Sequence, residues 1–184
     1  MKTETAAAYQ EAREILEELG YTFQAMVLDG KRGIKEVFTG IPIQHCQFHQ
    51  IKTINYYLTR RPKLQAAKEL RAIALSLTKV SEGYFTNLLN QWHEKWNKFL
   101  KERTIHSENP KRWFYTHKRT RSAYRSLKTN LPYLFTYQKY PELKIPNTTN
   151  SLDGTFSHLK QLLNTHRGLK CERRWKLIQE ILRK

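Results

Sequence analysis

The chain has 184 residues, of which 33 are Lys or Arg and 16 are Asp or Glu, so its formal net charge is +17. This surplus favours a nucleic-acid partner, because cationic side chains displace counterions from phosphates, and it argues against a small acidic metabolite. No apolar run is long enough to span a bilayer, and two cysteines are too few for a disulfide framework. We therefore expect a protein of the reducing cytoplasm with no membrane partner.

The first elements alternate between helix and strand. Thr5 caps a predicted helix that ends near Leu19, and two short apolar runs predict strands at residues 21–28 and 41–46. Parallel strands need a crossover connection, so alternation at this spacing is typical of an α/β fold with a parallel sheet.

Helical periodicity dominates the rest of the chain. It predicts helices at residues 48–61, 64–77, 84–103 and 119–127, another that begins near Asn150, and a basic helix at 172–183. The aromatic stripe within 84–103 is interpreted as core packing rather than as a ligand site. Prolines predict loops at 130–132 and 140–146. The expected parts of the chain are residues 1–61, a basic helical segment over 62–146, and C-terminal helices over 147–184.

Asp29 and Asp153 are the two aspartates of the chain. Asp29 follows a predicted strand and precedes Gly30, at the place where α/β proteins bind ligands. A simple Asp-Gly turn is the alternative interpretation. With Asn150 as the N-cap, Asp153 becomes the third residue of a helix, which fits a capping box and also leaves its carboxylate near a helix start.

Cys46 and His49 form a Cys-x-x-His motif after the second predicted strand. Such a pair is half of a zinc site, and the other half could come from His166 and Cys171. That pairing would make the chain a small zinc-binding structural domain. Alternatively, Cys46 is a small buried apolar residue, as most free cysteines are.

The densest basic stretch lacks acidic residues and is interleaved with aromatic ones. A pattern of this kind is typical of a surface that contacts phosphates, although a solvated helix face is the alternative. The candidate DNA-binding residues are Lys111, Arg112, Lys118, Arg119, Arg121, Arg125 and Lys128.

Three motifs occur in a fixed order, with a long helical stretch between the last two. They are Val-Leu-Asp-Gly at residues 27–30, Cys-Gln-Phe-His at 46–49 and Thr-Thr-Asn-Ser-Leu-Asp at 148–153. Together they resemble the bacterial insertion-sequence transposases of the Mutator-like superfamily, and most closely the variant with an N-terminal zinc-binding segment. The resemblance implies an α/β fold: a partial RNase H-like core that keeps two parallel strands and carries a large all-helical insertion.

The same resemblance implies a DDE active site for DNA transposition. Asp29 matches the second catalytic acid and Asp153 the third, where most relatives have Glu. These acids would hold two Mg²⁺ or Mn²⁺ ions, which cleave and join DNA strands, while Cys46, His49 and Asn150 support the site. The implied partners are double-stranded DNA, as transposon ends and target, and a second copy of the chain in a synaptic complex near the bacterial nucleoid.

The sequence departs from the family before Asp29, where the first acid and the first three strands of the core have no counterpart. We therefore expect the C-terminal part of a transposase that does not cleave DNA alone, with one edge of the strand at 21–28 left open. A non-catalytic basic nucleic-acid-binding domain is the alternative function.

Overall fold

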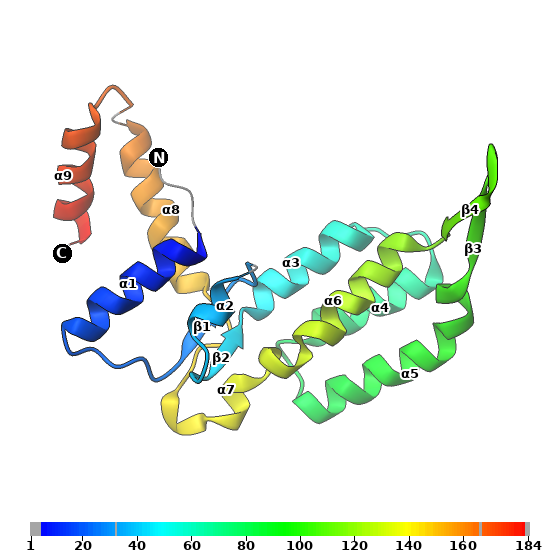
Figure 1. Ribbon diagram of the computed structural model, residues 1–184. Coiled ribbons are helices and arrows are strands. Elements are labelled where there is room, and N and C mark those ends of the chain that lie inside the picture. The colour runs from blue at the N-terminus through cyan, green and yellow to red at the C-terminus, as the bar shows by residue number, and fades with distance from the viewer. Residues whose placement is uncertain (1–4, 32, 166, 183–184) are drawn as a thin grey trace. The chain divides into compact units, whose positions relative to one another are not determined.

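The computed structural model describes residues 5–31, 33–165 and 167–182 (Figure 1). The chain divides into two compact units, residues 1–148 and residues 149–184, and each unit is described by itself. The fold is mixed α/β and mostly helical, with one small parallel sheet. None of the helices in the described ranges combines the length and the apolar character that a membrane span requires.

The predicted alternation of helices and strands is confirmed at the start of the first unit. Its elements are α1 (Ala6–Glu18), β1 (Met26–Leu28), α2 (Ile34–Val37), β2 (Ile43–His45) and α3 (Gln47–Leu58). The two strands are parallel, with Leu28 opposite His45. The residues that follow them therefore lie at the same edge of the sheet. In the described part of the chain β1 pairs with β2 alone, which leaves its other edge without a strand, as expected.

Both strands are shorter than the apolar runs that predict them. Phe23 lies outside β1 and packs its ring against Phe38, with 5.7 Å between ring centroids. Leu28, Ile34 and Phe38 form a small buried core on which Phe23 packs. The apolar residues before β1 therefore serve packing against the α2 region, and pairing extends over three residues of each strand.

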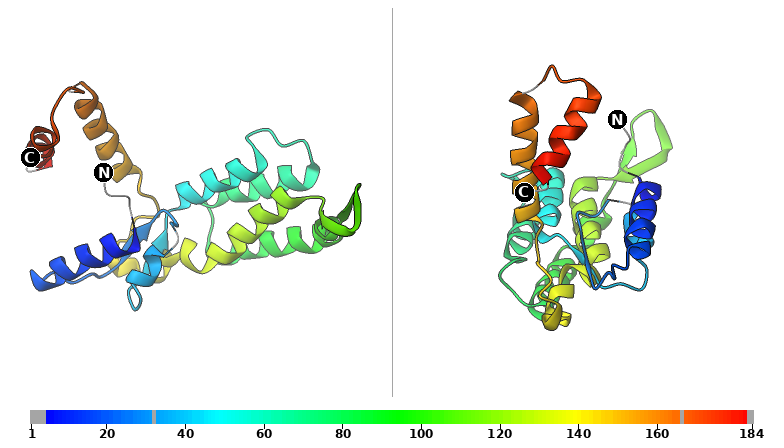
Figure 2. Two further views of the ribbon diagram at one scale, coloured as in Figure 1. Left: turned by 45° about the horizontal axis from the view of Figure 1, so that its top comes forward. Right: turned by 90° about the vertical axis from the view of Figure 1, so that its left-hand side faces the viewer.

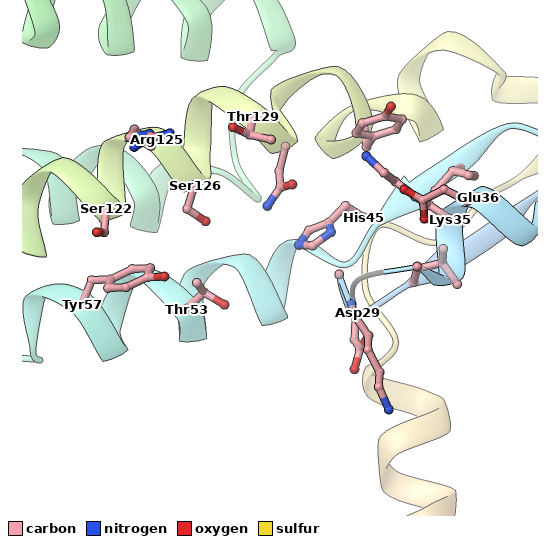
Figure 3. Close-up of a pocket in the computed structure, with 17 residues that line it drawn as sticks. Asp29, Lys35, Glu36, His45, Thr53, Tyr57, Ser122, Arg125, Ser126 and Thr129 are labelled. Carbon is pink, nitrogen blue, oxygen red and sulfur yellow. The ribbon is translucent and has the colours of Figure 1, made fainter. Parts of the chain in front are cut away.

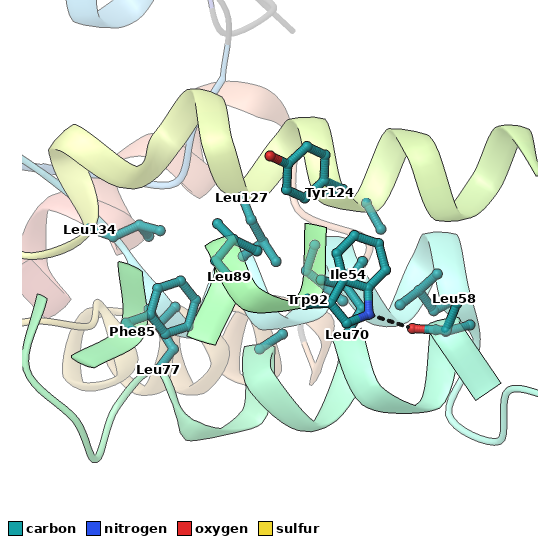
Figure 4. Packing of buried hydrophobic residues seen from close by; sticks show 14 of the residues in the cluster. Ile54, Leu58, Leu70, Leu77, Phe85, Leu89, Trp92, Tyr124, Leu127 and Leu134 are labelled. Atoms are coloured by element: carbon teal, nitrogen blue, oxygen red, sulfur yellow. Dashed lines mark hydrogen bonds between the residues drawn. The ribbon is translucent and has the colours of Figure 1, made fainter. Parts of the chain in front are cut away.

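Four helices form the main hydrophobic core of the first unit (Figure 4). They are α3, α4 (Gln65–Ser76), α5 (Glu82–Lys101) and α6 (Lys118–Leu134), in which α4 and α6 contact α3 and α5 contacts α4 and α6. The interpretation of the aromatic stripe as core is confirmed, because Phe85, Leu89 and Trp92 are buried. The indole N–H of Trp92 donates to the carbonyl oxygen of Ala66 at 2.9 Å, so its burial leaves no unpaired donor.

An antiparallel hairpin connects α5 to α6, so the prediction of an all-helical insertion is wrong in this segment. β3 (Arg103–His106) pairs with β4 (Asn109–Tyr115), and the hairpin projects from one end of the helices (Figures 1 and 2). Residues 104–105 and 113–115 are β-branched or aromatic, and both types favour strands. The basic residues among them obscure this pattern when charge alone is considered.

α6 is longer than predicted and runs through Pro132 to Leu134. A proline in the helix interior removes one backbone hydrogen bond and normally favours an end, which is why the sequence predicts a loop there. α7 (Thr136–Lys139) and a short 3₁₀ turn, η1 (Pro141–Leu143), follow.

Two buried glutamines hold the carboxyl end of α6. The side-chain amides of Gln44 in β2 and Gln47 in α3 each donate to the carbonyl oxygen of Leu134 at 2.9 Å. The Gln44 side-chain oxygen also accepts from the backbone N–H of Tyr137 at 3.0 Å. The last carbonyls of a helix have no partner within the helix, so these amides satisfy a group that would otherwise be unpaired.

Further hydrogen bonds connect α6 to α3, and the residues after α6 to β2. The amide of Asn130 donates to the side-chain oxygen of Gln50 at 2.8 Å, and Gln50 donates to the Ser126 hydroxyl at 3.1 Å. The Thr136 hydroxyl donates to the carbonyl oxygen of Ile43 at 2.6 Å. The sheet, α3 and α6 are therefore connected by hydrogen bonds as well as by apolar packing.

The second unit contains two helices among its described residues, α8 (Asn150–Thr165) and α9 (Cys171–Leu182), which contact each other. α9 begins one residue before the predicted start. Its predicted last residue, Arg183, lies outside the described residues.

Replacing Gln44 with leucine should lower the free energy of unfolding by about 2–3 kcal/mol, because the Tyr137 N–H loses its acceptor and Leu134 loses one donor. Urea denaturation measures the change. The matched control is Gln65→Leu, which removes an exposed side-chain contact to Glu69 and should cost less than about 0.5 kcal/mol. Equal losses of unfolding free energy in the two variants would show that the hydrogen bonds of Gln44 do not stabilise the fold.

Candidate active site

Asp29 lies where the sequence predicts it, directly after β1 at the carboxyl edge of the parallel sheet. One of its carboxylate oxygens accepts from the backbone N–H of Lys31 at 3.0 Å, so the turn that follows the strand is closed by the aspartate itself. The turn interpretation of Asp29 is therefore confirmed, and the site interpretation, which is compatible with it, stays a prediction. The side chain remains exposed.

A pocket of about 750 Å³ adjoins Asp29 and lies entirely within the first unit (Figure 3). α3 contributes Thr53 and Tyr57 to its walls, and α6 contributes residues at positions 122, 125, 126, 129, 130 and 133. Lys35 and Glu36 of α2 line it near the strand ends. The pocket therefore combines two carboxylates, three cations including Lys31, and a row of hydroxyl groups.

His45, the last residue of β2, is 8 % exposed and lines the same pocket. Burial lowers the pKa of its imidazole from 6.5 to about 4; the nearby Asp29 carboxylate opposes this shift and His49 adds to it. His45 is therefore neutral at neutral pH.

Gly30 lies directly against the His45 ring. Its φ is +92°, and a Cβ built at this position would come within 2.1 Å of the Cε1 atom of His45. Glycine is thus required both by the backbone conformation and by the close approach of the imidazole.

Cys46 and His49 follow β2 at the same edge of the sheet as Asp29. Cys46 is fully buried, and its backbone N–H donates to the carbonyl oxygen of Leu28 at 2.7 Å. The Nδ1 atom of His49 is buried and has no hydrogen-bond partner within the described residues. The role of both residues in supporting the active site stays a prediction.

The alternative zinc site is not assembled among the described residues, where no group of three or more potential metal ligands occurs. Cys171 is exposed in the second unit, and His166 lies outside the described residues. That hypothesis also stays a prediction.

Asp153 is exposed near the start of α8 in the second unit. Asn150 is the first residue of this helix, so the prediction that it serves as the N-cap is wrong by one position. Thr149 precedes the helix instead, and its hydroxyl donates to the Asp153 carboxylate at 3.2 Å. Because each unit is described by itself, the prediction that Asp29 and Asp153 face one cleft stays a prediction.

The predicted DNA-binding residues occupy different settings on the hairpin and on α6. Arg125 lines the pocket. The Arg121 guanidinium lies 3.5 Å from the centroid of the Tyr115 ring and donates to the carbonyl oxygen of Leu100 at 2.7 Å. Arg121 therefore helps to fix the base of the hairpin. The remaining predicted residues are Lys111 and Arg112 on β4, and Lys118, Arg119 and Lys128 on α6.

Cationic side chains of the hairpin and of α6 also lie over aromatic rings of the hairpin. The guanidinium of Arg103 lies 3.9 Å from the centroid of Trp113, and the ammonium of Lys118 lies 4.2 Å from that of Phe114. Both rings are partly exposed. The arrangement is suited to contacts with phosphates and with unstacked bases.

Sequence reasoning missed the hydroxyl groups of the pocket. Serine and threonine residues of α6 recur with Arg125 at spacings of three and four residues, which places them on one face of the helix. That spacing is a signal the sequence carries, but short hydroxyl side chains on a helix face are too common to indicate a site by themselves.

No protein-family model matches the chain, and neither curated proteins nor solved structures include a significant match. The resemblance to Mutator-like transposases, and the roles it implies, therefore stay predictions. A function for the chain has to rest on the geometry and the charge of this site.

Gly30→Ala should lower the free energy of unfolding by more than about 2 kcal/mol, because it adds a steric clash with His45 to the cost of a positive φ. Gly40→Ala is the matched control: Gly40 has a φ of +86° with no atom within 4 Å of the added Cβ, so only about 1 kcal/mol of backbone strain is expected. Thermal or urea denaturation gives both values. When His45 is also replaced by Ala, Gly30→Ala should cost no more than Gly40→Ala does. If Gly30→Ala still costs more in that background, the clash with the His45 ring is not the cause.

The low pKa of His45 makes stability depend on pH. The unfolded chain takes up this proton near pH 6.5, whereas the folded protein does so only near pH 4. As the pH falls between these values the unfolded state gains protons first, so the free energy of unfolding should fall by up to about 3 kcal/mol. Urea denaturation over this range measures the effect.

The control for this pH dependence is His45→Gln, which should lack this component and have a flatter profile. His93, whose pKa burial also lowers, is present in both proteins and cancels in the comparison. Identical profiles for the two proteins would exclude a buried neutral His45.

Proposed function

We propose that this chain binds DNA as part of a DDE-type transposase, in which Asp29 is one of the carboxylates that hold the catalytic metal ions. The supporting observation is the position of Asp29 at the carboxyl end of a parallel strand, beside a pocket that Lys35 and Arg125 also line. Open α/β sheets bind ligands at this edge. On this proposal, the sheet is part of an RNase H-like core.

Asp29 has the chemistry of a magnesium ligand but does not complete a site. Carboxylate oxygens are the ligands that Mg²⁺ prefers. The described residues contain no group of three metal-binding side chains, so further acids are needed. We assign Asp153 as a second ligand, with a third acid required for the pair of ions. When bound, such ions activate a water or a 3′-hydroxyl and stabilise the departing oxygen of a phosphodiester.

The charge of the chain supports DNA as the substrate. The net charge of +17 favours a polyanion, and the hairpin presents partly exposed Trp113 and Phe114 beside cationic side chains. Contacts of this kind with phosphates position a protein on DNA without reading its sequence.

The alternative is a non-catalytic nucleic-acid-binding domain. The exposed cationic and aromatic hairpin supports it equally well, and it needs no metal site. The two functions differ in what they require of Asp29: the transposase needs its carboxylate to bind a metal ion, whereas the binding domain does not.

Paramagnetic broadening by Mn²⁺ tests the assignment of Asp29 and Asp153. In the isotopically labelled chain, substoichiometric Mn²⁺ should broaden the amide signals of Asp29–Gly30 and of Asp153–Gly154 together, because both carboxylates would approach one metal site. Asp29→Asn should abolish the broadening at both places. Glu36→Gln, which neutralises another carboxylate of the same pocket, is the control and should retain it.

Broadening at only one of the two aspartates, or unchanged broadening in Asp29→Asn, would contradict the shared metal site. DNA affinity measured in the same variants separates the two functions. Asp29→Asn that binds DNA normally, with no specific Mn²⁺ effect in the unmodified chain, would favour the non-catalytic binding domain.

A further inference from the structure

The pocket beside Asp29 has the form of a groove between two helices. Ser122, Ser126 and Thr129 lie on one face of α6, and Thr53 and Tyr57 lie on the facing side of α3 (Figure 3). The two walls belong to helices that contact each other and are joined through Gln50, so they have a defined separation.

Neutral hydroxyl groups are the majority on the two helical walls of this groove. Hydroxyl and amide groups donate hydrogen bonds to phosphate and sugar oxygens, and their short side chains leave space for a ligand between the helices. Lys31, Lys35 and Arg125 add positive charge, and Asp29 and Glu36 add negative charge. Ser126 and Asn130 already bond with Gln50. An apolar ligand would exclude water from the other hydroxyl groups without offering acceptors, whereas a phosphodiester backbone supplies acceptors along its whole length.

The size of the groove determines whether a single strand or a duplex can enter it. Its volume of about 750 Å³ is that of a site for a ligand of modest size. A short piece of one strand fits this space, but a duplex, whose major groove alone is about 12 Å wide, does not.

Two tyrosines add flat surfaces on which unpaired bases can stack. Tyr57 lines the α3 wall, and Tyr133 lines the groove with the Lys35 ammonium 5.0 Å from its ring centroid. Stacking on aromatic rings, together with a positively charged track for the backbone, is the usual way in which proteins bind single strands.

Charge also gives the groove a direction. Figure 3 shows Arg125 and Asp29 toward opposite ends of the pocket, with Glu36 on the side of Asp29. Arg125 attracts phosphates at its end, whereas at the other end the carboxylates of Asp29 and Glu36 offset the ammonium groups of Lys31 and Lys35. A strand held along α6 would therefore lead toward Asp29.

We propose that the groove between α3 and α6 binds a short unpaired segment of a DNA strand and directs it to Asp29. This inference rests on the proposed function, from which it takes DNA as the ligand. It adds that the strand next to Asp29 is separated from its complement, with its backbone on the hydroxyl groups and Arg125.

Fluorescence anisotropy with a labelled single-stranded oligodeoxynucleotide and with the corresponding duplex tests the proposal. Thr129→Asp places a negative charge in the groove and should weaken single-strand binding by about tenfold or more, because it replaces a hydrogen-bond donor by a repelling carboxylate. Asn90→Asp makes the same change of charge at an exposed position of α5, and should weaken it by less than about twofold.

A second matched pair removes a positive charge instead of adding a negative one. Arg125→Gln should weaken single-strand binding by about tenfold, whereas Arg61→Gln, exposed after α3, outside the groove and outside the predicted DNA-binding residues, should have an effect of less than about twofold. The two substitutions of each pair should weaken duplex binding to the same extent. Circular dichroism melting of every variant confirms that the fold is kept.

Equal effects within both pairs on single-strand binding would overturn the groove assignment, as would loss of duplex binding that parallels loss of single-strand binding. A single-stranded RNA of the same base sequence that competes more strongly than the DNA would overturn the choice of ligand. These outcomes leave the Mn²⁺ measurement unaffected, so the metal-site proposal can stand when the groove assignment fails. Absence of binding to any nucleic acid would contradict both the groove assignment and the proposed function.

Discussion

The carboxyl end of α6 is the point on which the rest of the first unit depends. The carbonyl of Leu134 is one that helix geometry leaves unpaired, and the buried amides of Gln44 and Gln47 satisfy it. Gln44 lies in β2 and Gln47 at the start of α3, so this one helix cap connects α6 to both the sheet and α3. The walls of the pocket are α3 and α6 and its end is the sheet edge, so this cap and the Gln50 hydrogen bonds together fix its dimensions.

The helical core could be predicted because it depends on a local pattern. Phe85, Leu89 and Trp92 recur at helical spacing, and burial of that face needs no knowledge of its partners. The hairpin also has a local pattern, but basic residues between its β-branched and aromatic residues obscure it. The end of α6 depends on distant residues, because α6 continues through Pro132 to an end whose cap comes from residues far away in the sequence.

The candidate site also has one part that the sequence predicts and another that depends on tertiary packing. Asp29 could be located from the sequence, because an apolar run that ends in Asp-Gly is a local signal for a strand end. The pocket could not, since Thr53 and Ser122 belong to different helices and meet across a groove only through tertiary packing. The neutral state of His45 has no sequence signal either, because it results from burial against Gly30 and its surroundings.

The cap on α6 also bears on how the protein folds. Gln44 and Leu134 are 90 residues apart in the chain, and closing so long a loop costs conformational entropy before any contact repays it. α4 and α5 are neighbours in sequence, so their contacts form without this cost, and local contacts of that kind are made early in folding. The groove is therefore assembled after the helices between its two walls, and pulse-labelled amide exchange would detect protection of α4 and α5 before that of β2.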